Sequence, residues 1–351
     1  MDSDHTSIPA RVAGSIARLV YVVPRWVAML VAATSCLWAS GAKASPWVLE
    51  KGVFAVGLSA GAGLASSEFL PDGRNQAFPL RGRFDSYFVQ LDTRAGVGNG
   101  FEVTFKTLVK GVSYQADPVI LTDKGPQNSL TLNDARQGVF NFSRRALGLA
   151  DLYLGAVYQH YRGSVIVASS VELKLPSGYV GPKETFRDRS PLPGQVADDV
   201  ALGDAQVDLQ YMLELGWVIQ RTRTFFALNL GYRARFNGPG HQALGEVKVG
   251  QAIGKRVFVF ATAETALTLF DGEVIGTTFV AKDPLQPADR FELSNLETLN
   301  LRLDRSFVSV GGGVILRAGG NEWVASASRV VWGRNYSELT QFSLGVIVPF
   351  R

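Results

Sequence analysis

Hydrophobic side chains at every second position constrain this chain more than any other feature of its sequence. In residues 205–217 the odd positions from Val207 to Trp217 are apolar, and the positions between them are mostly polar or small. Because successive side chains of a strand point to opposite faces, the pattern predicts a strand with one apolar and one polar face. About ten residues of such a strand, when tilted, cross a bilayer.

The same alternation recurs along the chain. It is regular in residues 101–110, 164–175, 224–236 and 257–269. It is less regular near Val53, Phe84, Leu152, Val247, Val310, Val324 and Phe342. Together these segments predict an all-β protein, an antiparallel transmembrane β-barrel of about twelve strands in one domain.

The lengths of the connections point to a bacterial outer membrane. Short links at residues 97–100, 162–163, 220–223, 254–256 and 319–322 alternate with longer ones at 67–82, 113–147, 176–203, 237–243 and 271–305. Outer-membrane barrels have tight periplasmic turns and longer outer loops. The link at 333–337 is short although it should face outward.

Two segments between the strands carry weaker patterns. Leu299, Leu301 and Leu303 are odd, whereas Val308 and Val310 are even. A β-bulge near residues 304–306 would produce this change of parity. The segment 128–146 is also expected to hold a short helix that starts near Asn133 and Asp134.

The N-terminus has the pattern of a secretory signal peptide. A basic stretch ends at Arg25, an apolar run covers residues 26–39, and Ala42 and Ala44 are small as signal peptidase requires. We expect cleavage after Ala44 and a mature barrel of residues 45–351. A membrane anchor is the alternative, but it needs about 20 apolar residues. The single cysteine, Cys36, lies in this segment, so the mature chain has no disulfide.

Composition excludes several classes of protein. With 46% hydrophobic and 19% charged residues, the chain has enough apolar surface to fold. The formal charge is +4, and without the four basic and two acidic residues of 1–44 it is +2. This excess is too small for nucleic-acid binding by phosphate neutralisation. Three histidines and one cysteine disfavour a metalloenzyme, so we expect no metal or cofactor.

Few residues are candidates for catalysis, and we expect no enzyme activity. His160 lies at the periplasmic end of a predicted strand and His241 in a loop, and an interfacial role explains both better than catalysis. Asp198, Asp199 and Asp204 could bind a divalent ion, but a solvated loop is favoured because they lack EF-hand spacing.

The polar faces of the predicted strands carry both signs of charge and some aromatic rings. Unpaired charges are not buried dry, so these side chains either line water or neutralise one another across a narrow lumen. The residues expected to face the lumen are Phe88, Asp92, Arg94, Glu102, Lys106, Lys110, Asp151, Tyr153, Glu172, Lys174, Asp208, Glu214, Arg233, Arg235, Glu246, Lys248, Phe258, Phe260 and Glu264.

The last strand also matches an outer-membrane barrel. It alternates from Phe342 to Phe350 and is followed by Arg351, whereas most such proteins stop at the aromatic residue. We expect this strand to be read by the barrel-insertion machinery. The remaining expected partners are outer-membrane lipids, lipopolysaccharide and a small hydrophobic solute, and the barrel is expected to be a monomer.

Three segments carry a resemblance to a known family. They are Gly148-Leu149-Ala150-Asp151, Lys174-Leu175-Pro176-Ser177-Gly178 and the stretch 202–208. They resemble the outer-membrane family associated with the meta-pathway of phenol degradation, which has Gly-Leu-Gly-Asp and Lys-Leu-Pro-Thr-Gly. Residues 73–80 are similar to related uncharacterised exported barrel proteins. Ala150 and Ser177 depart from the family pattern.

The resemblance implies a transporter-like barrel for hydrophobic small molecules, distantly akin to fatty-acid and toluene channels. Those channels carry an N-terminal plug, which we do not expect here because few residues precede the first strand near Lys51. The expected function is passage or binding of a small hydrophobic or mixed-polarity solute. The alternatives are a structural or adhesive barrel that binds through loops 113–147, 176–203 and 271–305, and a membrane-embedded lipid hydrolase.

Overall fold

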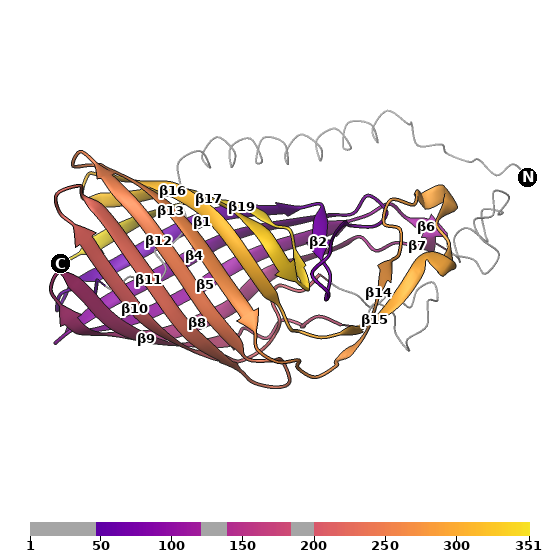
Figure 1. Ribbon diagram of the computed structural model, residues 1–351, viewed down its shortest axis with the longest axis horizontal. Coiled ribbons are helices and arrows are strands. Elements are labelled where there is room, and N and C mark those ends of the chain that lie inside the picture. Colours follow the sequence, from indigo (N-terminus) through magenta and orange to yellow (C-terminus); the bar gives the residue numbers. More distant parts are fainter. Residues whose placement is uncertain (1–46, 121–138, 184–199) are drawn as a thin grey trace, which may run out of the picture.

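The computed structural model describes residues 47–120, 139–183 and 200–351 and contains a closed antiparallel β-barrel (Figure 1). The barrel strands are β1 (Phe54–Ala65), β4 (Arg83–Gly98), β5 (Phe101–Gln115), β8 (Arg144–Arg162), β9 (Val165–Pro176), β10 (Asp208–Ile219), β11 (Thr224–Arg235), β12 (Gln242–Ile253), β13 (Val257–Thr268), β16 (Ser306–Ala318), β17 (Asn321–Arg334) and β19 (Thr340–Phe350). β1 pairs with both β19 and β4 and so closes the sheet. The prediction of twelve strands is confirmed, and the fold places the protein in a bacterial outer membrane.

The tight turns gather at one end of the barrel, where the C-terminus also lies (Figure 1). This end is periplasmic by the rule that short turns face the periplasm. The turn between β4 and β5 requires left-handed backbone at Asn99 and Gly100, with φ of 52° and 76°. The long connections project from the other end.

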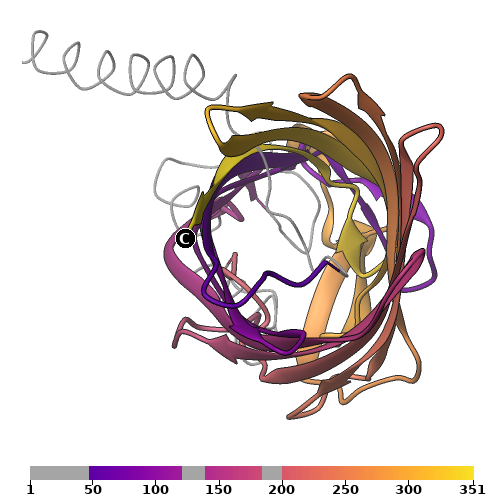
Figure 2. The same cartoon turned by 90° about the vertical axis from the view of Figure 1, so that its left-hand side faces the viewer.

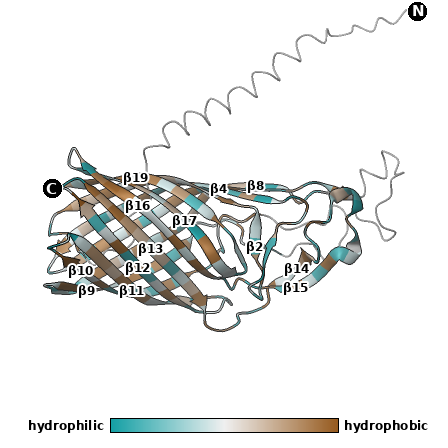
Figure 3. Ribbon diagram, turned by 45° about the horizontal axis from the view of Figure 1, so that its top comes forward, coloured by the Kyte–Doolittle hydropathy of each residue, from teal (hydrophilic) through white to brown (hydrophobic). Residues whose placement is uncertain are grey.

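The outward wall of the barrel is apolar over a band that suits a bilayer (Figure 3). Aromatic rings occur at both edges of the band. Trp217 stacks on Phe226 at 4.5 Å near the periplasmic turns. Tyr232 and Phe270 contact the ring of His241 near the outer end, with centroid distances of 5.5 and 5.1 Å. These two groups match the aromatic girdles of outer-membrane barrels.

The outer loops contain small sheets and a core of their own. β14 (Gly276–Ala281) pairs with β15 (Leu296–Leu301), and η2 (Ala288–Arg290) and η3 (Leu293–Asn295) connect them. β6 (Val119–Ile120) pairs with β7 (Val139–Phe140), and β2 (Ser67–Phe69) lies between β3 (Asn75–Ala77) and β18 (Tyr336–Ser337). Leu80, Val119, Ala281 and Phe291 are buried together and join three of the loops.

One local expectation is wrong, and two others concern residues that the structure does not describe. The bulge expected near residues 304–306 is wrong, because β15 leaves the barrel and the non-strand residues 302–305 separate it from β16. A register shift occurs instead between Val308 and Ser309, where β17 has one extra residue. The helix expected near residues 133–134 and the pair Asp198 and Asp199 lie outside the described residues. Among the described residues, no helix has the length and apolarity to cross a membrane.

Two adjacent residues of β13 can test which side chains point to lipid and which point to the lumen. Ala263 points to lipid between Val247 and Val310, whereas Thr262 lines the inner cavity. We expect Ala263→Arg to destabilise the barrel by about 2–4 kcal/mol, the usual cost of Arg near the bilayer midplane. Thr262→Arg should cost clearly less, because its side chain can reach water. Denaturant-dependent folding into lipid vesicles measures both, and equal losses would contradict this register.

Candidate functional site: the lumen of the barrel

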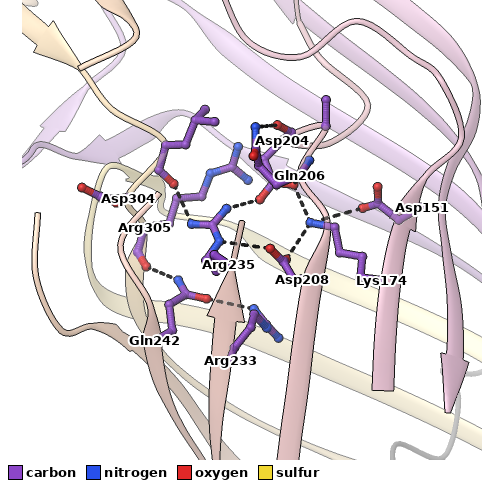
Figure 4. Close-up of polar contacts among 12 residues, drawn as sticks. Asp151, Lys174, Asp204, Gln206, Asp208, Arg233, Arg235, Gln242, Asp304 and Arg305 are labelled. Atoms are coloured by element: carbon purple, nitrogen blue, oxygen red, sulfur yellow. Dashed lines mark hydrogen bonds and ion pairs between the residues drawn. The ribbon is translucent and has the colours of Figure 1, made fainter. Parts of the chain in front are cut away.

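The lumen has two unlike halves. Charged side chains of β8, β9, β10 and β11 pair across one half, chiefly toward the outer end (Figure 4). Lys106 of β5 also pairs with Glu172 of β9 in this half. The other half, bounded by β11, β12, β13, β16, β17 and β19, holds a cavity of about 1700 Å³. Among the described residues, this cavity gives a solute room along the wall formed by these strands.

Lys174 is the centre of the paired half. Its Nζ lies 2.5 Å from Asp204, 2.9 Å from Asp208 and 3.9 Å from Asp151. Arg235 contacts Asp204 and, at 3.5 Å, Asp208, and it donates to the carbonyl of Leu303 at 3.0 Å. Each of the three carboxylates thus lies within ion-pair distance of Lys174 or Arg235. Buried charges are tolerated when they are paired in this way. We call Asp151, Lys174, Asp204, Asp208 and Arg235 the outer ion cluster.

Asp204 brings the loop before β10 into this cluster. Burial alone would raise the pKa of Asp204, but Arg305, Lys174 and Arg235 together hold that pKa well below its usual range. Its charge therefore persists to strongly acid pH. Because the native pKa is depressed, the stability that ionised Asp204 contributes is present at neutral pH and is lost only as the pH falls below the ordinary range of Asp.

Tyr179 connects the segment that follows β9 to the outer ion cluster. Its hydroxyl donates to Asp151 at 2.5 Å and accepts from the backbone N–H of Ala205 at 3.2 Å. Burial and the hydrogen bond to Asp151 raise the pKa of Tyr179, so the phenol stays protonated. Lys110 donates to the carbonyl of Leu202 at 3.1 Å. The connection between β9 and β10 is therefore held inward at both of its described ends.

A second charged group lies near the periplasmic mouth. Arg94 binds Glu102 through two contacts of 2.6 and 3.0 Å, and Glu102 is completely buried. Glu102 also accepts from the backbone N–H of Leu49 at 2.8 Å, and Arg94 donates to the carbonyl of Trp47 at 3.0 Å. The ion pair thus anchors residues 47–50, which cross the lumen in Figure 2.

Residues 47–50 occupy part of the lumen. The sequence predicted no N-terminal plug of the kind found in fatty-acid channels, because the segment before β1 is short. Val48 is buried inside the barrel against Val157 and Ala168. These four residues thus take up space near the periplasmic mouth, and the absence of a larger plug stays a prediction.

The cavity side is lined by rings and small residues. Phe225, Phe258 and Phe260 face it together with Glu246, Lys248, Glu264 and Arg317. The cavity extends from the periplasmic turns at Arg223 and Gly319 to Phe307, Tyr336 and Leu339 at the outer end. The described lining is therefore mainly apolar, with several aromatic rings and charges of both signs.

Glycines on neighbouring strands make room for these rings. A Cβ on Gly250 would lie 2.3 Å from the ring of Phe225, and one on Gly313 would lie 2.7 Å from the ring of Phe260. Phe88 covers Gly61 in the same way, at 2.4 Å. The rings lie flat against the wall over bare backbone, as aromatic residues do over strand glycines, and the cavity stays open because of it.

The structure places the residues predicted to face the lumen on the inner side of the sheet. Most of the charged ones, however, are paired with one another. Lys106 binds Glu172 at 3.2 Å and lies 4.0 Å from the ring of Tyr153. Asp92 accepts from Gln90 at 2.7 Å. The predicted residues that border the cavity itself are Arg94, Glu246, Lys248, Phe258, Phe260 and Glu264.

Several cavity residues were missed by the sequence reasoning. Phe225 was not selected, although the alternation of its strand places Phe226 outward and therefore Phe225 inward. Ile315, Val324 and Ile347 line the cavity on strands whose alternation is weak. The available signal was the run Gly311-Gly312-Gly313 together with Ser326 and Ser328, since small inward residues on adjacent strands leave space.

The two histidines have local partners near the barrel ends. His160 is hydrogen-bonded to the Ser169 hydroxyl at 2.8 Å and its ring contacts Tyr158 at 5.0 Å. His241 is hydrogen-bonded to the hydroxyl of Tyr232. Both arrangements fit the interfacial role. Within the described ranges, no group of three His, Cys, Asp or Glu is placed to hold a metal ion.

A closed antiparallel barrel with an apolar belt and a polar lumen defines the class of outer-membrane barrel proteins. No family model matches the chain, and no curated protein matches it. Among solved structures it is similar to the COG4313 outer membrane channel from Pseudomonas putida F1, with a TM-score of 0.58 and 9% identity over 89% of this chain and 100% of that chain. It also matches the KdgM porin, with a TM-score of 0.42, 8% identity, and coverage of 85% and 99%. The likeness to the channel shows a shared fold, and the predicted resemblance to the phenol meta-pathway family is not confirmed.

The outer ion cluster should be sensitive to loss of its central cation. Lys174→Met leaves Asp151, Asp204 and Asp208 without Lys174, and we expect a loss of about 3–5 kcal/mol, the usual cost of breaking a buried pair. Lys248→Met is the matched control, because Lys248 borders water and lies 3.4 Å from one partner, Glu246. Urea titration in lipid vesicles compares the two, and equal destabilisation would contradict the central role of Lys174.

Proposed function

We propose that the barrel gives passage to a small solute of mixed polarity along the cavity wall formed by β11, β12, β13, β16, β17 and β19. The observation that supports this proposal is the cavity of about 1700 Å³, which extends from the periplasmic turns to Phe307, Tyr336 and Leu339. Ligand sites of this kind are mainly apolar and contain a few polar groups that fix orientation. The paired half of the lumen supports the barrel, whereas the cavity half offers a path.

The chemistry of the wall favours an aromatic or short aliphatic solute with one charged or polar group. Phe225, Phe258 and Phe260 present ring faces and edges. The described lining holds six basic side chains, among them Lys248 and Arg317, and three acidic ones, Glu246, Glu264 and Glu322, so we expect a preference for anions. A highly charged or bulky solute would have to displace ion pairs, which is costly in a narrow lumen.

The path can be blocked at Ser326. Its side chain lines the cavity, whereas the adjacent Ala325 faces lipid opposite Val314. Ser326→Trp should reduce uptake of benzoate into proteoliposomes, and potassium chloride conductance in planar bilayers, by tenfold or more. Ala325→Trp should leave both within twofold. Equal behaviour of the two variants would place the path elsewhere, and a wild-type barrel silent in both assays would contradict the channel function.

Residues 47–50 are proposed to narrow the periplasmic end of this path. They depend on the pair Arg94–Glu102, which binds the backbone at Trp47 and Leu49. Deletion of residues 47–50 should increase the single-channel conductance at least twofold, because it removes the segment that crosses the lumen. An unchanged or lower conductance in the deletion variant would show that the constriction lies at another depth.

A structural or adhesive role is the second candidate, and one observation favours it. The outer loops have a shared core of Leu80, Val119, Ala281 and Phe291, so they present a formed outer surface. A barrel used only as a support would need no open cavity. The Ser326→Trp comparison therefore separates the two functions, since an adhesive barrel would be unaffected by it.

A further inference from the structure

On the outward surface of β4, β5 and β8, arginines lie next to the apolar belt, on the side of the outer loops. The ten steps from Phe101 to Gly111 along tilted β5 advance about 25 Å, the height of the apolar band of an outer-membrane barrel. Tyr87, Gly111 and Leu147 form the last apolar row, and the side chain of Leu147 is 79% exposed. The next outward row is Asp85, Ser113 and Arg145.

Arg145 points outward because of an irregularity in β8. The pairing of β5 with β8 shifts between Thr107 and Val109, where β8 has one extra residue. Below the shift Leu152 and Leu154 face lipid, and above it Leu147 and Leu149 do. Without the shift, Arg145 would face the lumen. The bulge thus adds a cation to the outer surface at the level where membrane headgroups begin.

Three chain segments meet around Arg145 and form a cleft of about 560 Å³. Its lining consists of Arg81, Arg83, Gln115, Ala116, Asp117, Ser143, Arg144 and Arg145. We call this lining the arginine cleft. The four arginines of the cleft, counted together with Asp117 of the lining and the neighbouring Asp85, give a formal charge of +2. Among the described residues Arg145 makes no ion pair, whereas Arg83 binds Asp85 at 2.7 Å and Arg81 binds Asp117 at 2.6 Å.

The arginine cleft is held in shape by hydrogen bonds between its segments. The N–H of Asp117 donates to the carbonyl of Leu80 at 2.9 Å. The hydroxyl of Ser143 accepts from the N–H of Ala116 and donates to its carbonyl, both at 3.1 Å. Arg144 donates to the carbonyls of Asn141 and Ser143 at 2.9 Å. These bonds fix the backbone segments that carry the arginines relative to one another. Guanidinium groups suit phosphate, which Arg binds through two parallel hydrogen bonds.

We propose that the arginine cleft binds the phosphorylated headgroup of an outer-leaflet glycolipid, with its acyl chains along Tyr87, Val89, Val109, Leu147 and Leu149. The net charge of +2 complements a phosphate ester, and the apolar rows directly below continue into the bilayer. A soluble phosphate would use the cations but not the apolar rows. The geometry therefore assigns the cleft to a lipid, and the ligand class is a bisphosphorylated glycolipid of the lipid A type.

Binding can be measured on the whole barrel refolded in detergent. The probes are bisphosphoryl lipid A, monophosphoryl lipid A, phosphatidylglycerol and inorganic phosphate, with dissociation constants from native mass spectrometry. We expect bisphosphoryl lipid A to bind at least tenfold more tightly than the other two lipids. Equal binding of the three lipids would overturn the proposal. Displacement of lipid A by an equal concentration of inorganic phosphate would also overturn it and indicate a soluble-phosphate site.

Two variants change the affinity in opposite directions. Arg83→Gln with Arg145→Gln should weaken lipid A binding tenfold or more, whereas Asp117→Asn should strengthen it by releasing Arg81 from its ion pair. Lys282→Gln with Arg334→Gln is the matched control, since it removes two exposed cations elsewhere at the outer end and should change binding less than twofold. Because general damage to the fold can only weaken binding, a weaker Asp117→Asn variant, or a control as weak as the arginine variant, would overturn the proposal.

Discussion

Every backbone N–H and C=O of a membrane-spanning segment must find a partner within the protein, because the bilayer core contains no water. In this chain β1 meets that condition by pairing with β19 on one side and with β4 on the other, so the sheet has no free edge. Closure with twelve strands also limits the width of the lumen. The inner surface must therefore be filled by side chains, by water or by a short stretch of chain.

The inner surface satisfies this limit in two different ways. On one side, Lys174 and Arg235 form ion pairs with three carboxylates, and the loop that contains Leu202 and Asp204 is held in the lumen. On the other side, rings lie over glycines, and the space that they leave free forms the cavity. The same strand can contribute to both, as β11 does with Arg235 and Phe225. This asymmetry is the physical basis of the proposed path.

The sequence predicted the strands well because a strand's inward and outward faces meet such different surroundings that alternation is visible within ten residues. It could not predict which inward charges pair. Asp204 reaches Lys174 and Arg235 from a loop, and no periodicity describes a loop. The outward direction of Arg145 depends on a single extra residue in β8, which leaves the local pattern nearly unchanged. Phe225 was missed for a related reason, since its strand is apolar on both faces near the periplasmic end.

Asp304 joins outer segments that are distant in the sequence. Its carboxylate accepts from the backbone N–H of Gly240 at 2.7 Å and of Gly272 at 2.6 Å, and its carbonyl accepts from Asn335 at 3.0 Å. The connections after β11, β13 and β17 are thereby coupled and should open as one cooperative unit rather than separately. Substitutions on the outer surface should accordingly be tolerated better at exposed positions such as Lys282, Leu285 and Asp289 than at the few residues that hold this junction.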